Sequence, residues 1–308
     1  DQVLETLVEH TSALDYHPDQ SPSTKPSLAY GASIKARSSV ETMFKIADLY
    51  GDSIKSGWVC IVATVMKVFA AELLTPEIIA VDGESMDQAK RRMPKPRPRS
   101  KGQSGSIFTR AINSLISIEA DGDLAYANAG GEMLRDMAKK SISSCSIESL
   151  VNDSKFLIVE SLIELISAII ASGQAVLALA TAEGAGGSNA APTDTAELAL
   201  ELLFSLSLRN RDRITLFWPR IHEFLAICTS QDSANVQGFA ALNKRAIEGL
   251  MRICQRILPY KEDTADMLLG SLSLVGEMQP RVVWELAPSI STELITLLSQ
   301  SAPHIRTE

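Results

Sequence analysis

Apolar residues recur at helical spacing in almost every patterned stretch of this chain, and this periodicity limits the fold more than any other feature. One stripe runs from Ile54 through Trp58 and Ile61 to Leu73, with apolar residues three and four positions apart. Such spacing places them on one face of a helix, whereas a half-buried strand alternates every second residue. No alternating runs are joined by an Asn-Gly or Asp-Gly turn. The sequence therefore predicts an all-α protein.

Short turns separate many of the predicted helices, so neighbouring helices should pack antiparallel. About ten such helices, in pairs of roughly 40 residues, favour a HEAT- or armadillo-like α-solenoid. A single globular helix bundle is the alternative. Beyond the first helix pairs, helices are expected at 107–118, 123–143, 194–208, 213–229, 236–258, 263–275 and 281–298.

Two stretches interrupt the helical pattern and suggest how the chain is divided. Residues 83–105 are rich in proline and basic residues, and residues 183–192 are rich in glycine and alanine. We interpret the first as a flexible insert and the second as a linker. The predicted domains are therefore two helical-repeat domains, 1–182 and 193–308.

Composition excludes some functions. The chain has 308 residues, with 29 basic and 37 acidic side chains, a formal net charge of −8 and a pI near 5.2. An acidic chain with 5% aromatic residues is not a general nucleic-acid binder. The four cysteines form no CxxC pair, which favours reduced thiols and a cytoplasmic location.

No residue pattern indicates an active site, a metal site or a cofactor. The four histidines have no ligand partner at zinc spacing, and the glycine cluster near 184–187 follows no strand. We expect no catalytic residue, metal or cofactor in this chain. A small helical enzyme is therefore the functional class that the sequence supports least.

One uncharged stretch, Leu165–Ala182, is almost long enough to span a membrane. Its first half continues an amphipathic pattern, and it contains Ser172 and Gly173. We interpret it as two buried helices that break at these two residues.

The strongest charge feature is a run of basic residues within the 83–105 insert, interleaved with prolines. These residues are Lys90, Arg91, Arg92, Lys95, Arg97, Arg99 and Lys101. The prolines predict an extended, mobile segment. Near anionic lipid each basic residue contributes about 1 kcal/mol, so the run is a candidate for weak membrane contact. An ordinary solvated loop is the alternative.

The first helix pair carries a second group of candidates. Lys35, Arg37, Lys45, Lys55 and Lys67 are expected to form a cationic strip, and Lys35, Arg37 and Lys55 are retained as lipid-binding candidates. The alternative is that they are ordinary solvated side chains.

Three stretches together resemble one protein family. The first comprises KARS at 35–38 and FKIADLYGDSIKSGW at 44–58. The second comprises DSKFL at 153–157 and ESLIEL at 160–165, and the third ELL at 201–203, NRDR at 210–213 and Trp218. Their order and spacing are similar to the large Golgi Arf guanine-nucleotide exchange factors of the GNOM, Gea and brefeldin-resistance type. The similar region is the one that follows the catalytic Sec-seven domain, and it comprises the first two homology-downstream-of-Sec-seven domains.

We interpret the residues that carry the resemblance first as structural residues. They are Gly51, Asp52, Gly57, Trp58, Glu160, Asn210, Arg211, Asp212, Arg213 and Trp218. Glycine at 51 would allow a tight exit from one helix, and Asp52 or Ser53 would cap the next. Trp58 would be buried between paired helices. The charged residues at 211–213 would form an inter-helix salt-bridge and capping cluster.

The resemblance implies a function as well as a fold. It implies a non-catalytic regulatory and membrane-targeting region, cytoplasmic and peripheral on Golgi membranes, that contacts anionic lipids such as phosphoinositides. It also implies contacts with Arf- or Rab-type small GTPases and with the rest of the exchange factor. An α-solenoid trafficking adaptor unrelated to Arf is the alternative.

Overall fold

The structure, a computed structural model, describes residues 2–15, 25–96, 128–183, 193–230, 239–260 and 262–301. Every regular element in these ranges is a helix, and none of the described residues lies in a strand. The predicted all-α class, with antiparallel helix pairs as in α-solenoids, is confirmed. The helices form two compact units, and each is described separately below.

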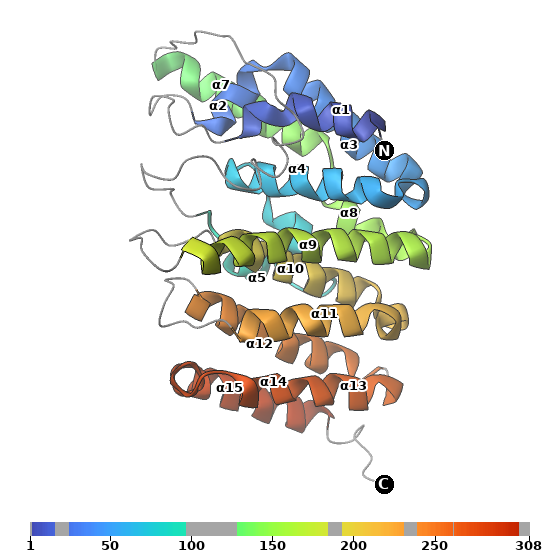
Figure 1. Cartoon of the computed structure of the whole chain (residues 1–308), viewed down its shortest axis with the longest axis vertical. Helices are drawn as coiled ribbons and strands as arrows, with labels where there is room; N and C mark the ends of the chain where they lie inside the picture. Colours follow the sequence, from blue (N-terminus) through green and yellow to red (C-terminus); the bar gives the residue numbers. More distant parts are fainter. Residues whose placement is uncertain are drawn as a thin grey trace. The chain divides into compact units, whose positions relative to one another are not determined.

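Unit 1 comprises residues 1–78 and 95–168. Its α-helices are α1 (Gln2–Glu9), α2 (Pro26–Ala32), α3 (Ile34–Tyr50), α4 (Trp58–Ala70), α7 (Asn128–Ser144), α8 (Ser149–Asn152) and the first part of α9 (Val159–Glu183). Short 3-10 turns connect them: η1 (His10–Leu14), η2 (Gly51–Ser53), η3 (Lys55–Gly57) and η5 (Asp153–Phe156), while η4 (Pro76–Ile79) lies at the boundary between the units. Helix α2 packs along α7, and α1 packs on α3 and α4 (Figure 1).

The core of unit 1 is centred on α4, whose residues from Ile61 to Phe69 are all buried. Among them is Lys67, whose ammonium lies 3.1 Å from a carboxylate oxygen of Asp15 and 3.3 Å from the Thr11 hydroxyl. The prediction that Lys67 is an exposed member of a cationic strip is therefore wrong. The lysine stem follows the apolar face, and its charge is neutralised where η1 covers α4.

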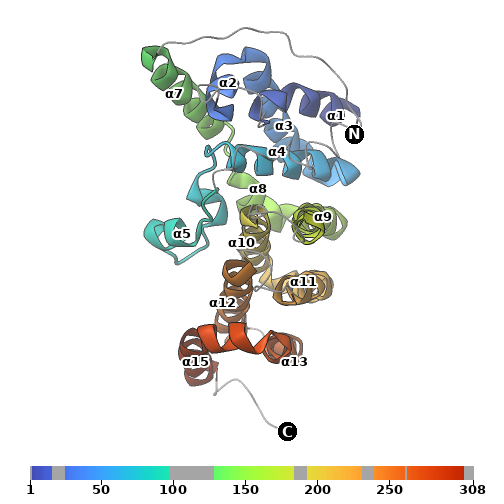
Figure 2. The same cartoon turned by 60° about the vertical axis from the view of Figure 1, so that its left-hand side comes forward.

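Unit 2 comprises residues 79–94 and 169–308. Its elements are α5 (Met86–Arg92), the second part of α9, α10 (Asp194–Arg209), η6 (Arg211–Arg213), α11 (Ile214–Thr229), α12 (Phe239–Ile257), η7 (Glu262–Thr264), α13 (Ala265–Gly270), η8 (Ser271–Ser273), α14 (Leu274–Glu277) and α15 (Pro280–Ser301). Helix α12 packs against α10, α11 and α15. Figure 2 shows α10, α12 and α15 in one layer and α9, α11 and α13 in a second, which is the two-layer stacking of helical repeats.

Helix α9 is continuous, so the predicted break at Ser172 and Gly173 is wrong. A side chain at Gly173 would place its Cβ 2.5 Å from the ring of Phe224 and 3.3 Å from the Cβ of Ala199. The glycine therefore allows α11 and α10 to approach α9 closely, and a helix interior tolerates it at a modest cost.

The described part of the 83–105 segment, residues 83–96, is also more ordered than predicted. Residues 86–92 form α5, which begins with a capping box in which Ser85 and Gln88 exchange side-chain and backbone hydrogen bonds. The prediction of an extended, mobile segment is wrong here because the prolines begin only at Pro94, beyond the end of the helix. Residues 97–101, the expected helix at 107–118 and most of the expected linker lie outside the described residues, so the predicted domain boundary stays a prediction.

Other helix limits differ from expectation by a few residues. The helix expected from Ser53 begins at Trp58, after the two 3-10 turns η2 and η3. The helix expected at 263–275 is divided into α13, η8 and α14. Lys55 has a φ of 49°, a left-handed conformation that explains why no single helix runs through this turn.

Candidate functional site

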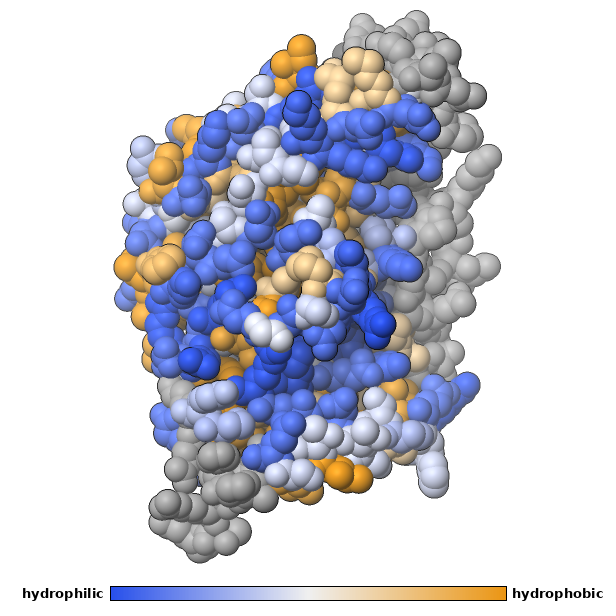
Figure 3. Space-filling model, turned by 180° about the vertical axis from the view of Figure 1, so that it is seen from behind, coloured by the Kyte–Doolittle hydropathy of each residue, from blue (hydrophilic) through white to orange (hydrophobic). Residues whose placement is uncertain are grey.

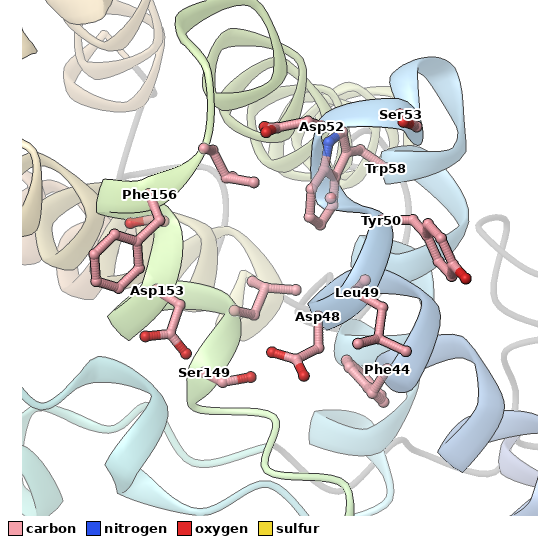
Figure 4. A pocket seen from close by; sticks show the side chains of 15 residues that line it. Phe44, Asp48, Leu49, Tyr50, Asp52, Ser53, Trp58, Ser149, Asp153 and Phe156 are labelled. Carbon is pink, nitrogen blue, oxygen red and sulfur yellow. The ribbon is translucent and has the colours of Figure 1, made fainter.

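A groove in unit 1 opens where α3 ends and α9 begins, between two of the three stretches that carry the family resemblance. Its volume is about 360 Å³, and it is lined by residues 44, 47–53, 58, 149–150, 153–154 and 156–157. We call it the motif groove. Figure 4 shows side chains from the end of α3 on one side and from α8 and η5 on the other.

Hydrogen bonds fix the floor of the motif groove. The indole N–H of Trp58 donates to the Ser161 hydroxyl over 3.0 Å, and this hydroxyl donates to the Gly51 carbonyl over 2.6 Å. A carboxylate oxygen of Asp52 accepts from the backbone N–H of Ile158 over 2.8 Å. These three bonds join the α3–α4 turn to the first turn of α9, so the two sides of the groove are held together.

Gly51 has a different role from the predicted one. Its φ of −47° is an ordinary helical value that any residue can adopt. A Cβ at this position would lie 2.7 Å from a methyl carbon of Leu157 and close to the Trp58 ring. The glycine therefore permits close contact between the turn and the α9 segment. Likewise the Asp52 carboxylate binds the backbone N–H of Ile158, just before α9 and distant in sequence, whereas no side chain caps α4. The prediction that Asp52 or Ser53 caps the next helix is therefore wrong.

The rim of the motif groove combines exposed apolar and acidic side chains. Phe156 is 73% exposed, Leu49 70% and Tyr50 61%. The carboxylates of Asp48 and Asp153 lie on facing sides of the opening (Figure 4). This arrangement suits non-covalent binding, since it presents apolar area and negative charge at the same opening.

Unit 2 contains a buried cluster of charged side chains centred on Glu201 of α10. Arg252 and Arg245 of α12 each lie 2.9 Å from a Glu201 carboxylate oxygen, and Arg92 of α5 also pairs with it. Arg245 pairs in addition with Glu197, and Arg92 with Glu84. The cluster therefore connects three helices through charge-assisted hydrogen bonds.

The electrostatic balance of this cluster favours the ionised form of Glu201. Burial alone would raise the pKa of Glu201, but the guanidinium groups of Arg252, Arg92 and Arg245 outweigh it and hold the pKa below its ordinary value. A carboxylate with 3% of its side chain exposed thus keeps its charge inside the protein. The cluster is a structural element rather than an acid–base catalyst, because every carboxylate in it is paired with arginine.

Arg92 belongs to this cluster, which corrects its interpretation as part of a cationic tether. Its side chain is 16% exposed and donates to Glu84, to Glu201 and to the Ile79 carbonyl. A membrane could recruit Arg92 only by breaking these bonds. Its neighbours Lys90 and Arg91 are exposed on α5, and Lys95 is exposed beyond it. Arg97, Arg99 and Lys101 lie outside the described residues.

The cationic candidates of the first helix pair also differ in accessibility. Lys35 and Lys55 are exposed, whereas Arg37 is half-buried and donates to the Gly31 carbonyl. Lys45 is exposed and pairs with Glu41 of the same helix over 2.8 Å. Of the predicted strip, Lys35, Lys45 and Lys55 are therefore exposed, and Lys45 is the one among them that pairs with Glu41.

The third stretch that carries the resemblance is only partly organised as predicted. Asn210 is buried and its side-chain amide donates to the Leu206 carbonyl, while Arg213 donates to the Asn210 side chain over 2.6 Å. Arg211 lies 5.1 Å from the ring centre of Tyr260, and Asp212 is exposed. The buried ionic cluster of unit 2 lies on α5, α10 and α12 around Glu201, and the sequence interpretation missed it. The predicted salt-bridge and capping cluster at 211–213 stays a prediction.

The expected burial of Trp58 is confirmed. Trp58 and Trp218 are 2% and 1% exposed, and Gly57 is buried beside Trp58. Glu160 lies exposed in the first turn of α9, where its charge complements the helix dipole.

The sequence did contain a signal for the Glu201 cluster. Glu197 and Glu201 are one turn apart in the otherwise apolar run of α10, and both are buried. A pair of acids inside an apolar helical stripe requires cationic partners. Which arginines supply them is decided by residues more than 40 positions away in sequence, so spacing alone could not identify them.

No group of histidine, cysteine, aspartate or glutamate side chains within the described residues is arranged to hold a metal ion. One described helix segment, Val159–Ala178, is long and apolar enough to cross a membrane, but 61% of it is buried against other parts of the protein. A core helix of a folded protein meets the same criteria, and the packing of α9 supports that interpretation. On the face drawn in Figure 3 hydrophilic side chains predominate and apolar ones are scattered.

Comparison with known proteins identifies relatives of this chain. The "ARF guanine-nucleotide exchange factor GNOM" of Arabidopsis thaliana is 32% identical over 322 aligned positions that cover the whole chain. The Arabidopsis exchange factor GNL1 is 29% identical over 91% of the chain, and the Caenorhabditis elegans "Golgi-specific brefeldin A-resistance guanine nucleotide exchange factor 1 homolog" is 27% identical over 90%. No family model matches the chain.

The chain spans only between a seventh and a fifth of the length of these relatives, at 21%, 19% and 14%. The matches confirm the resemblance to the large Arf exchange factors that the three motif stretches predict. An adaptor unrelated to Arf, the alternative interpretation, is not supported by them.

Proposed function

Because this chain is related along its whole length to a segment of the large Arf guanine-nucleotide exchange factors, we propose that it is a non-catalytic regulatory region of such a factor. The region acts in Golgi vesicle trafficking, and exchange itself is carried out by a catalytic domain elsewhere in the parent protein. It helps to place the factor peripherally on the cytoplasmic face of Golgi membranes, and it contacts small GTPases of the Arf or Rab type.

The observation that carries this proposal is the match of 90% or more of the chain to three exchange factors, one of which is named as Golgi-specific. The described structure adds physical support for the membrane contact. Lys90, Arg91 and Lys95 are exposed and follow one another closely in sequence, and Lys35 and Lys55 are exposed in unit 1. Each contributes about 1 kcal/mol near an anionic surface, although the net charge of −8 opposes approach.

Screening decides between these opposing effects. At physiological salt, charges more than about 8 Å apart are largely screened, so a local group of lysines at a surface outweighs acidic residues farther away. Membrane binding should therefore be weak and sensitive to salt.

The test is sedimentation of the 308-residue chain with vesicles of phosphatidylcholine, with and without phosphatidylinositol 4-phosphate. One variant replaces Lys90, Arg91 and Lys95 with Gln, and a second replaces Lys35 and Lys55. The control removes three exposed charges from α7, at Arg135, Lys139 and Lys140. Arg92 is left intact, because its loss would disturb the buried cluster of unit 2.

We expect the triple variant at 90, 91 and 95 to lose roughly a hundredfold in partitioning to anionic vesicles, about 3 kcal/mol, and the α7 control to lose much less. Binding by the parent chain should fall as salt is raised. Equal binding by all four chains, or binding that salt does not change, would show that the membrane part of the proposal is wrong.

A further inference from the structure

We propose that the motif groove of unit 1 is a docking site for a short peptide segment of another protein, which carries a large apolar side chain flanked by Lys or Arg. The proposal goes beyond the proposed function, since it requires neither a membrane nor a small GTPase.

The apolar rim supplies the first argument. Single exposed apolar residues are common on protein surfaces, but a group around one concavity indicates an interaction site. Phe156, Leu49 and Tyr50 are each more than 60% exposed and all line the same groove of about 360 Å³. A groove of this size lies within the range that accommodates a bound side chain or small ligand.

Charge complementarity selects the occupant. Three carboxylates, of Asp48, Asp52 and Asp153, line the groove, and no lysine or arginine does. The Asp52 carboxylate accepts from the backbone of Ile158, but no described cation pairs with Asp48 or Asp153. Lys155 lies beside the rim, with its ammonium 4.9 Å from the Phe156 ring centre, over the aromatic face. An occupant with flanking positive charge would therefore complement the opening.

The rigidity of the floor supplies a further argument. The hydrogen bonds that join Trp58, Ser161 and Gly51 hold the two sides of the groove in place before any partner arrives. A preformed groove loses little conformational entropy on binding, which leaves more of the contact energy for affinity. The same carboxylates argue against an anionic membrane as the occupant, because they would face like charge.

The experiment uses the full chain and two dye-labelled amphipathic probe peptides. In the first peptide one helical face carries leucines and a tryptophan and the other carries lysines, and in the second every lysine is replaced with glutamate. Fluorescence anisotropy gives the Kd of each. Two variants test the site, Phe156→Ala and the pair Asp48→Asn with Asp153→Asn.

The matched control variants replace exposed residues of the same kinds outside the motif groove. Trp284→Ala removes an aromatic side chain that is 80% exposed on α15, and Glu132→Gln with Asp136→Asn removes two exposed carboxylates of α7. Circular dichroism melting checks folding. Since Phe156 is 73% exposed, we expect its replacement to leave Tm almost unchanged.

We expect the lysine peptide to bind, the glutamate peptide to bind at least about tenfold more weakly, and both groove variants to weaken binding about tenfold or more while the controls do not. Binding of neither peptide, equal binding of the two, or binding that the groove variants leave unchanged would overturn the proposal. Binding to anionic vesicles that Phe156→Ala abolishes would also overturn it, because the groove would then be a lipid site.

Discussion

The two units of this protein use different interactions to join helices that are distant in sequence. In unit 1 the α3–α4 turn is joined to α9 by neutral and singly charged hydrogen bonds around Trp58, Ser161 and Asp52. In unit 2 helices α5, α10 and α12 meet at a buried cluster of charges around Glu201. Both units also bury a tryptophan whose indole N–H donates to a serine hydroxyl over 3.0 Å, Trp58 to Ser161 and Trp218 to Ser271.

This difference determines which side chains in each unit remain available to bind other molecules. The charged cluster uses its arginines to neutralise buried carboxylates, so those residues are not available to bind other molecules. The junction in unit 1 needs only a few hydrogen bonds and one close glycine contact, and it leaves Phe156, Leu49 and Asp48 exposed around a groove. The motif groove is therefore the better candidate for an interaction site.

Replacement of Glu201 by Gln should cause the largest change in this comparison. The variant leaves three guanidinium groups without their central carboxylate, and breaking a buried charged network costs about 3–5 kcal/mol. The free energy of unfolding from urea denaturation should fall by that amount. Glu223→Gln, at an exposed position of α11, serves as the control. A loss no larger than that of the control would show that the cluster contributes no net stability.

Acid should weaken unit 2 in the same way. The folded pKa of Glu201 lies below its ordinary value of 4.5, so the stabilisation by the ionised carboxylate is present above that pH and is lost as pH falls through the folded pKa. The difference in unfolding free energy between the parent chain and Glu201→Gln should shrink as pH is lowered from neutrality to below 4.5. A difference that stays constant across this range would contradict the pairing.

The smallest expected effect comes from the two tryptophans. Trp58→Phe and Trp218→Phe each remove one buried N–H donor, while Ser161 and Ser271 keep hydrogen bonds to the Gly51 and Met267 carbonyls. Each variant should lose about 1–3 kcal/mol of unfolding free energy. Double-mutant cycles with Ser161→Ala and Ser271→Ala measure the coupling energy of each tryptophan–serine pair. Unequal coupling energies would show that the two pairs do not contribute equally to their units.

Much of the fold could be predicted from the chain because helical periodicity is a local property. The stripe from Ile61 to Phe69 placed α4 correctly, and the limits of α10 and α11 were predicted to within one residue. The start of α4 was not predicted correctly. The 3-10 turns at 51–57 that precede it depend on the positive φ of Lys55 and on contacts with residues near 157. The burial of Lys67 and Arg92 was missed for the same reason, since their partners Asp15 and Glu201 are remote in sequence.

The sequence by itself determined the class of this protein, all-α with paired helices, and through three motif stretches its relation to the Arf exchange factors. Tertiary structure alone decided that two of those stretches form opposite sides of one groove, and that an arginine assigned to a tether is instead a buried ionic partner. Periodicity reports which face of each helix is apolar. It does not report which distant helix covers that face, because that choice depends on side-chain packing and charge pairing between segments that meet only after folding.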